Sequence, residues 1–248
     1  MNFLKKAPKR GIVESYGLLK IRFSGNPMPL MKMVQTLFVG WILGLIALGR
    51  LFAAAPDDLL PSSHFVGSAA LVNNTNAAKL QAIWALPLTR DFQSNVLQKA
   101  ASLSATFLGD KSADKNQIGL IRPLLDDLIS GESIAELRGT TAANAEIYLA
   151  VQLKEDRSRL WETNLLQLTK SKATPVKVDD VSGWQTKLSQ RKKFIHFYRL
   201  GKWTVVVVGR EQSPARSDFL KRLPKKVDGP AKNWLEADLD LPRLKMLL

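Results

Sequence analysis

The pattern of apolar and polar positions predicts five strands in the second half of the chain. They are SIAELRG (133–139), AEIYLAVQLK (145–154), KFIHFYRL (193–200), WTVVVVGR (203–210) and NWLEADLDL (233–241). Amphipathic helices follow the second and fourth strands, as RLWETNLLQLTK (159–170) and SDFLKRL (217–223). We therefore expect an α+β fold in which strand-strand-helix units build one antiparallel sheet, with the helices on one face.

The first half of the chain is less regular. The apolar segments FVGSAALV (65–72) and KLQAIWALP (79–87) indicate two more strands. The segments DFQSNVLQKAASLSATFLG (91–109) and DKNQIGLIRPLLDDLIS (114–130) have helical spacing. Pro123 should kink or restart the second of these helices, because proline lacks the backbone N–H that a helix interior needs.

A run of seventeen uncharged and mostly apolar residues extends from Met33 to Gly49. At about 1.5 Å per residue this helix would fall just short of a hydrocarbon core of about 30 Å. The side chain of Arg50 could reach the far headgroups, so that the following residues complete the span. The expected parts are a basic cytoplasmic tail (1–32), a transmembrane signal-anchor (33–55), a linker (56–64) and an extracytoplasmic α+β domain (65–248).

Positive charge lies almost entirely on the N-terminal side of this run. Residues 1–50 hold eight Lys or Arg against one acid, whereas residues 51–78 hold two Asp and no Lys or Arg. Positively charged flanks stay on the cytoplasmic side of a membrane, and the opposite flank is translocated. We therefore expect a bacterial inner-membrane protein with a cytoplasmic N-terminus and its main domain outside the cytoplasm.

Two alternatives remain for the apolar run. The small residues Ala53–Ala55 are typical of a signal-peptidase site, which Pro56 directly afterwards weakens, and a cut after Gly49 is also compatible. Translation from Met28 or Met31 would favour such a cleaved signal without changing the orientation. A buried core helix is the third interpretation, and it is disfavoured because apolar side chains cover all sides of the run.

The net charge of +14 has a second concentration, since residues 187–226 hold twelve Lys or Arg against two acids. Cations alternate there with aromatic residues, as on surfaces that bind single-stranded nucleic acid. Because the domain is expected outside the cytoplasm, we expect no nucleic acid but an anionic lipid, a glycan phosphate or an acidic protein. The candidate contacts are Arg191, Lys192, Lys193, Arg199 and Lys202. For the aromatic residues we favour a second interpretation, in which most of them form sheet core and the cations protect the sheet edge.

Three acids, Glu236, Asp238 and Asp240, share one face of the last predicted strand. Oxygen ligands with this spacing could converge on Ca²⁺ or Mg²⁺. We favour a solvated face that the cations of residues 187–226 balance, and we expect no metal site, because no other acidic cluster completes the ligand shell. Asp240 could also cap a helix that begins at Pro242.

Catalytic signatures are weak. The chain has no Cys and only two His, of which His64 falls in the expected linker and His196 in a strand between aromatic residues. Ser112 to Lys115 match Ser-x-x-Lys, but the elements that accompany this motif in acyltransferases are lacking, so a solvated turn is the better interpretation. The paired acids Asp126–Asp127 and Asp179–Asp180 are interpreted as surface residues. We therefore expect no cofactor, and we favour a protein without enzymatic activity.

The leading hypothesis is a single-pass envelope protein whose domain binds or scaffolds without catalysis. The last segment, PRLKMLL (242–248), has no helix stop signal, which suggests that the chain continues beyond Leu248. This favours, as the alternative, an envelope hydrolase or acyltransferase whose active site lies in a missing C-terminal part. A third hypothesis is a cytosolic nucleic-acid binder. Ligand, oligomeric state and pathway do not follow from the sequence.

Overall fold

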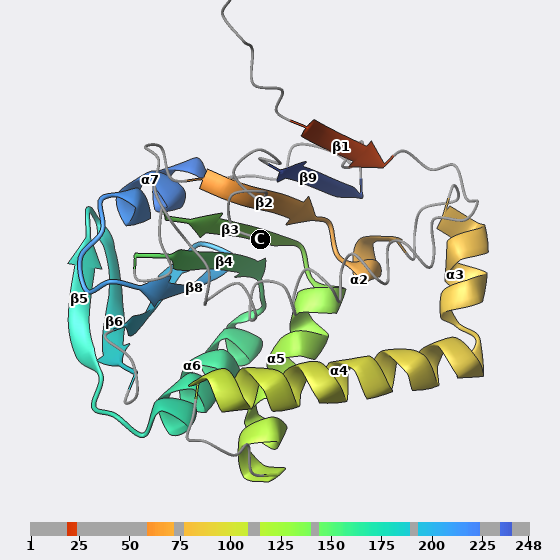
Figure 1. Ribbon diagram of the computed structural model, residues 1–248, viewed down its shortest axis with the longest axis horizontal. Helices are drawn as coiled ribbons and strands as arrows, with labels where there is room; N and C mark the ends of the chain where they lie inside the picture. Colours follow the sequence, from red (N-terminus) through yellow and green to blue (C-terminus); the bar gives the residue numbers. More distant parts are fainter. Residues whose placement is uncertain are drawn as a thin grey trace, which may run out of the picture.

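The computed structural model describes residues 19–23, 59–71, 77–108, 115–139, 144–188, 193–223 and 234–239. The strands are β1 (Leu19–Phe23), β2 (Leu59–Phe65), β3 (Ser133–Arg138), β4 (Glu146–Gln152), β5 (Thr174–Val178), β6 (Val181–Lys187), β7 (Phe194–Leu200), β8 (Trp203–Gly209) and β9 (Leu235–Leu239). The helices are α2 (Ser68–Leu71), α3 (Ala78–Trp84), α4 (Pro87–Leu108), α5 (Lys115–Ser130), α6 (Glu155–Thr169) and α7 (Ala215–Arg222). Among the described residues, nine strands form one antiparallel sheet in the order β1-β9-β2-β3-β4-β8-β7-β6-β5 (Figure 1). The predicted α+β class with an antiparallel sheet is confirmed.

The strand-strand-helix units of the second half are also confirmed, as β3-β4-α6 and β7-β8-α7. The β7–β8 hairpin closes at Gly201, whose positive φ of 58° suits the tight turn predicted there. The aromatic residues of this hairpin belong to the core, as expected: Phe197, Tyr198 and Trp203 are buried. The alternation of side chains along β7 sends Phe197 to one face of the sheet and Tyr198 to the other.

The expectation that all helices cover one face of the sheet is wrong. Helices α4, α5 and α6 pack on one face, around a core that includes Trp161 and Phe197. Helix α7 lies on the opposite face, where Phe219 packs against Tyr148 and Tyr198 (Figure 1). The physical reason is that β8 is a continuous apolar run and is buried on both sides, so both of its faces require a cover.

The hairpin of β5 and β6 was not predicted. Pro175 in β5 and Gly183 in β6 interrupt the apolar pattern, and both residues are ordinarily poor strand formers. Here Gly183 is required, because a Cβ atom at this position would lie 2.1 Å from the carbonyl oxygen of Phe197 on the neighbouring strand. The turn between the two strands contains Asp179, whose φ is 51°.

The first half differs more from its prediction. The segments predicted as strands over 65–72 and 79–87 contain instead the helices α2 and α3. The strand lies earlier, since β2 begins at Leu59 and occupies most of the linker expected over 56–64. The two predicted helices are confirmed as α4 and α5, and α5 continues through Pro123 without ending.

Strand β9 lies between β1 and β2 (Figure 1), so the two segments that flank the apolar run in sequence pair with the same strand. The signal-anchor expected over 33–55, the parts 1–18 and 24–32 of the tail expected over 1–32, and the segment after 239 lie outside the described residues. Within the described ranges, no helix combines the length and the apolar character needed to cross a membrane.

Candidate functional site

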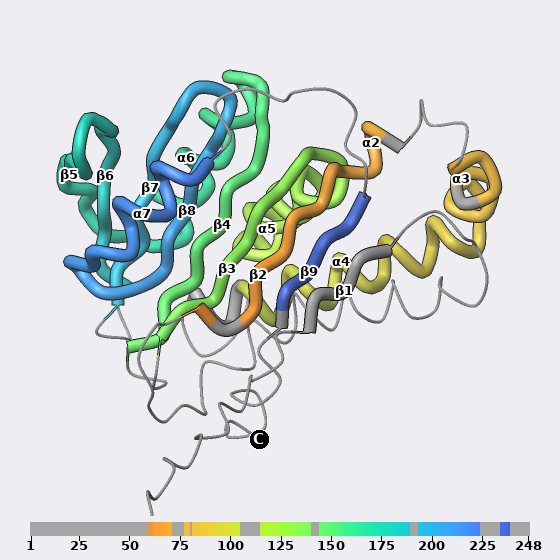
Figure 2. Tube along the Cα trace, turned by 90° about the horizontal axis from the view of Figure 1, so that it is seen from above, coloured from red at the N-terminus to blue at the C-terminus, as the bar shows by residue number. Residues whose placement is uncertain are grey.

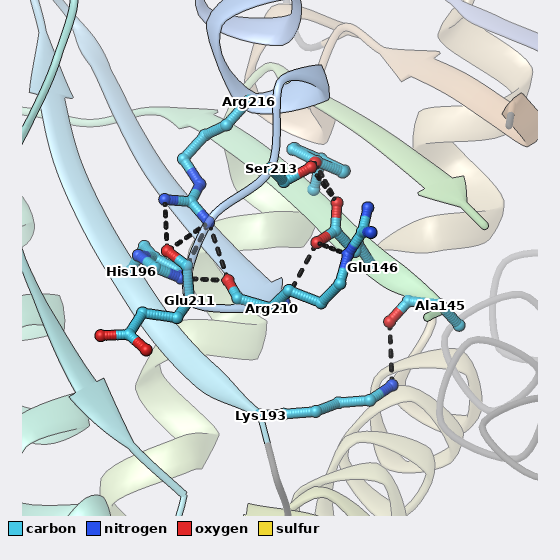
Figure 3. A network of polar contacts seen from close by, with 9 residues as sticks. Ala145, Glu146, Lys193, His196, Arg210, Glu211, Ser213 and Arg216 are labelled. Carbon is cyan, nitrogen blue, oxygen red and sulfur yellow. Dashed lines mark hydrogen bonds and ion pairs between the residues drawn. The ribbon is translucent and has the colours of Figure 1, made fainter. Parts of the chain in front are cut away.

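The most polar part of the interior lies under α7, and we name it the α7-face cluster. It consists of Glu146, His196, Arg210, Ser213 and Arg216 (Figure 3). Four elements supply these residues: the first position of β4, the interior of β7, the loop after β8, and the first turn of α7. The cluster therefore ties the β8–α7 connection to the middle of the sheet.

Glu146 anchors one half of the cluster, and its side chain is 2% exposed. One oxygen, Oε2, accepts hydrogen bonds from the hydroxyls of Tyr148 and Ser213, each at 2.6 Å. The other, Oε1, accepts from the backbone N–H of Arg210 at 3.0 Å and from its Nε at 3.1 Å. Burial raises the pKa of Glu146, but the hydrogen bonds from Ser213, Tyr148 and Arg210 outweigh it, so the pKa lies below its ordinary value. Glu146 is therefore a buried, ionised carboxylate.

His196 and Arg216 form the other half, and both are almost fully buried. Nη2 of Arg216 lies 3.0 Å from Nε2 of His196 and donates to the carbonyl oxygen of Arg210 at 2.8 Å. Nε2 of His196 also lies 2.9 Å from that carbonyl oxygen. Burial, followed by the charge of Arg216, lowers the pKa of His196 to about 4. The imidazole is therefore neutral at pH 7.

A neutral imidazole has one N–H, and this arrangement cannot satisfy both of its nitrogens. Nε2 of His196 can donate to the carbonyl of Arg210 or accept from Arg216, but not both at once. Among the described residues, neither Nδ1 of His196 nor Nε of Arg216 has a hydrogen-bond partner. The cluster is thus incompletely satisfied at this point, which is costly in a buried site.

The chemistry open to the α7-face cluster is limited. Ser213 donates its hydroxyl proton to Glu146, a carboxylate whose lowered pKa makes it a weak base. In the described part of the chain, His196 contacts Arg210, Arg216 and the rings of Phe194 and Tyr198, and Ser213 hydrogen-bonds to Glu146 instead. A nucleophile and a base are therefore not paired here as acyl transfer requires.

The candidate anion-binding residues do not gather at one place. Lys193 precedes β7, whereas Arg199 and Lys202 lie at the far end of the β7–β8 hairpin, about 20 Å along the strand. Nζ of Lys193 donates to the carbonyl oxygen of Ala145 at 2.8 Å (Figure 3). Arg199 forms an ion pair with Glu162 of α6 at 2.6 Å, and Lys202 is exposed. Arg191 and Lys192 lie outside the described residues.

Acids elsewhere in the fold balance much of the basic segment 187–226. The pairs are Arg199 with Glu162, Arg210 with Glu146, Lys221 with Asp179, and Arg222 with Glu136. Glu136 and Glu146 are buried acids of β3 and β4. None of these four pairs involves an acid of the last strand, where the backbone register sets Glu236 opposite Arg22 and Asp238 opposite Lys20.

In the described part of the chain, no three His, Asp or Glu side chains gather as metal ligands. Asp240 and residues 112–114 of the predicted turn lie outside the described residues, and Lys115 is the first residue of α5. His64 is in β2 rather than in a linker, and its Nε2 lies 2.7 Å from Oε1 of Glu132.

A second polar cluster, around Asp127, was missed because Asp127 was interpreted as a surface acid. Asp127 is buried and accepts from the guanidinium of Arg157 at 2.9 to 3.1 Å and from the indole of Trp161 at 2.8 Å. Its neighbour Asp126 is exposed and pairs with Arg122, as a surface acid would. A signal was available, since Asp127 lies three residues after Leu124 and therefore on the side of α5 that carries the buried residues.

Comparison of the chain with protein-family models, with curated proteins and with solved structures finds no match.

Proposed function

We propose that the protein is anchored in a membrane by residues 33–55 and that its α+β domain binds or scaffolds outside the cytoplasm without catalysis. The observation that carries the proposal is the uncharged run from Met33 to Gly49, with basic residues concentrated on its N-terminal side. Possible binding partners are anionic lipid headgroups, phosphate-bearing glycans and acidic proteins.

A non-catalytic role is supported by how the polar groups of the domain are used. Glu146, Asp127 and Glu136 are buried carboxylates, and each accepts hydrogen bonds from residues of other elements. Ser213 and Tyr148 donate to Glu146, so these hydroxyls are engaged in holding the α7 connection. Such groups stabilise and orient elements of the fold.

The pairing of β1 with β9 favours a second arrangement, in which the apolar run enters the membrane and returns to the same side. Strands β1 and β2 both pair with β9, although the apolar run lies between them in sequence. A single crossing would place β1 and β2 on opposite sides of the membrane, so β1 could not pair with β9 in the inserted protein. Retention of that pairing would require the apolar run to enter the membrane and return to the same side.

Orientation is tested by fusing a reporter that is active on only one side of the membrane after residue 60, with a second fusion after residue 18 as control. The single crossing predicts opposite signals from the two fusions. Protease added to spheroplasts should digest the part after Pro56 and spare the tail. Equal signals from the two fusions, or protection of the whole chain, would contradict the proposal.

The mass of the membrane-bound chain separates an anchor from a cleaved signal. Because Pro56 follows the Ala53–Ala55 segment, we expect the full calculated mass. A mature form that begins near Arg50 or Pro56 would identify the apolar run as a removable export signal. The domain would then be released rather than anchored.

A further inference from the structure

Large apolar side chains are exposed at one corner of the domain, where α3 meets α4. They are Ile83, Leu86, Leu88 and Phe92, with exposed fractions of 36%, 52%, 81% and 49%. Together with the rest of residues 77–99, we name this region the α3–α4 corner. Single exposed apolar residues are ordinary, but four within ten residues form a patch that indicates an interaction surface.

The geometry of the corner keeps these side chains away from the core. Leu88 and Phe92 are four residues apart on α4 and therefore lie on the same side of the helix. Most of the buried residues of α4 lie from Leu97 onward, further along the helix, where it packs on α5. Both views show α3 and the first turns of α4 projecting beyond the sheet (Figures 1 and 2).

The charges of the corner are mainly positive. Lys79, Arg90 and Lys99 are exposed, against the single exposed acid Asp91. Apolar side chains flanked by Lys and Arg on a helix are typical of segments that lie in the interface of an anionic membrane, with the apolar side chains inserted below the headgroups.

We propose that the α3–α4 corner lies against the surface of an anionic lipid bilayer, with Leu88 and Phe92 inserted among the headgroups. This inference rests on the proposed membrane anchor. Between Gly49 and Leu59 there are nine residues, so the chain can extend over about 33 Å at most. The domain is therefore held close to the bilayer, and a patch of this composition would meet lipid before it meets a soluble partner.

The chain has no Cys, so single labelling sites can be introduced into the whole protein without background. Leu88→Cys and Phe92→Cys carry an environment-sensitive fluorophore, and Asp180→Cys, at the exposed β5–β6 turn, serves as the control. The full chain is reconstituted in vesicles of phosphatidylcholine, with or without phosphatidylglycerol. Aqueous iodide and spin-labelled lipids are the two quenchers.

We expect labels at positions 88 and 92 to shift to the blue, to lose iodide quenching and to gain quenching by spin-labelled lipid, most strongly with phosphatidylglycerol. The label at position 180 should stay accessible to iodide. Replacement of Lys79, Arg90 and Lys99 by Gln should remove the dependence on phosphatidylglycerol, because the electrostatic part of the binding is lost.

Flotation of the chain with the vesicles tests the anchor separately. If the chain floats but labels 88 and 180 are equally accessible to iodide, the corner does not touch lipid and the anchor stands. If the chain does not float, both the anchor and this inference are wrong. Shielding of label 88 that increases with protein concentration, without quenching by lipid, would show that a second copy covers the corner and would also contradict the inference.

Discussion

Oδ2 of Asp127 accepts a hydrogen bond from the indole Nε1 of Trp161 at 2.8 Å, inside the interface between α5 and α6. The same carboxylate accepts two hydrogen bonds from Nε of Arg157 and one from its Nη2. It therefore satisfies a buried indole and orients a guanidinium with one side chain, which joins two helices of the larger core.

Asp127→Asn should lower the free energy of unfolding by about 2 to 3 kcal/mol, because an amide accepts fewer of these hydrogen bonds and leaves a buried donor unsatisfied. The adjacent substitution Asp126→Asn is the matched control, since that carboxylate is exposed and pairs only along its own helix with Arg122. It should cost less than about 0.5 kcal/mol. Urea unfolding of both variants measures the difference, and equal effects would contradict the structural role of Asp127.

The two acids also illustrate how far the sequence predicts this structure. Regular patterns sufficed for β3, β4, β7, β8, β9 and the four longer helices, because each buries a face with a clear period. Asp126 and Asp127 are the same residue type, and they differ in burial through the phase of α5, which the apolar spacing of the helix indicates but residue type alone does not. Tertiary packing decided which acid became buried.

The other differences between the predicted and the observed fold also arise from tertiary contacts. Strand β2, with Pro61 and three consecutive polar residues, has no strand pattern of its own and is held by β3 and β9 on its two sides. Gly183 in β6 was not recognisable as a strand residue without its contact to Phe197. The cover of α7 over the second face was predictable, because the four consecutive valines of β8 cannot leave one face in water.

Glu146 should be the most sensitive acid of the α7 face. Glu146→Gln removes the charge that four hydrogen bonds stabilise. The free energy of unfolding should fall by about 3 kcal/mol. Glu162→Gln is the control: Glu162 also accepts from an Arg and from an indole, but its side chain is 33% exposed. That variant should cost less than about 1 kcal/mol.

Thermal or urea unfolding at neutral pH measures both Glu variants. The α7 connection should also become more accessible to amide hydrogen exchange in the Glu146 variant, because Ser213 and Arg210 lose their common acceptor. Similar losses for the two variants would mean that the Glu146 network contributes no more than a surface pair.

His196 should make the domain less stable in acid. Its pKa is about 4 in the folded protein and about 6.5 when unfolded, so the unfolded chain binds more protons between these values. Stability should be full above about pH 6.5 and fall as the pH decreases toward 4, by about 3 kcal/mol in total. The charged groups that face His196 are Arg216 and Glu146, and the lowered pKa of Glu146 places its own effect below about pH 4.5.

The chain has only two His, which provides a direct control. Urea unfolding between about pH 8 and pH 5 should show the slope in the native chain and in His64→Gln, but not in His196→Gln. A slope that persists unchanged in His196→Gln would contradict its assignment to His196. Amide exchange at neutral pH confirms that each variant is folded before its slope is interpreted.

The pairing of β1 with β9 gives the sharpest test of membrane topology. Ala237 of β9 lies opposite Ile21 of β1 on one side and opposite Ser63 of β2 on the other. A chain with Cys at 237 and 63 and a chain with Cys at 237 and 21 therefore probe the two neighbours of one residue. No native Cys competes for the reagent.

If the apolar run crosses the membrane once, residues 19–23 are on the cytoplasmic side and the domain is outside, so β9 becomes the edge of the sheet. A short bismaleimide should then cross-link Ser63→Cys to Ala237→Cys in the membrane fraction but leave Ile21→Cys and Ala237→Cys unlinked. Cross-linking of the first pair shows that the sheet is folded. Absence of the second cross-link would then mean that β1 is not paired with β9. Cross-linking of both pairs at similar rates would show that β1 and β2 share one side of the membrane, and the single crossing would have to be abandoned for an apolar run that enters and returns.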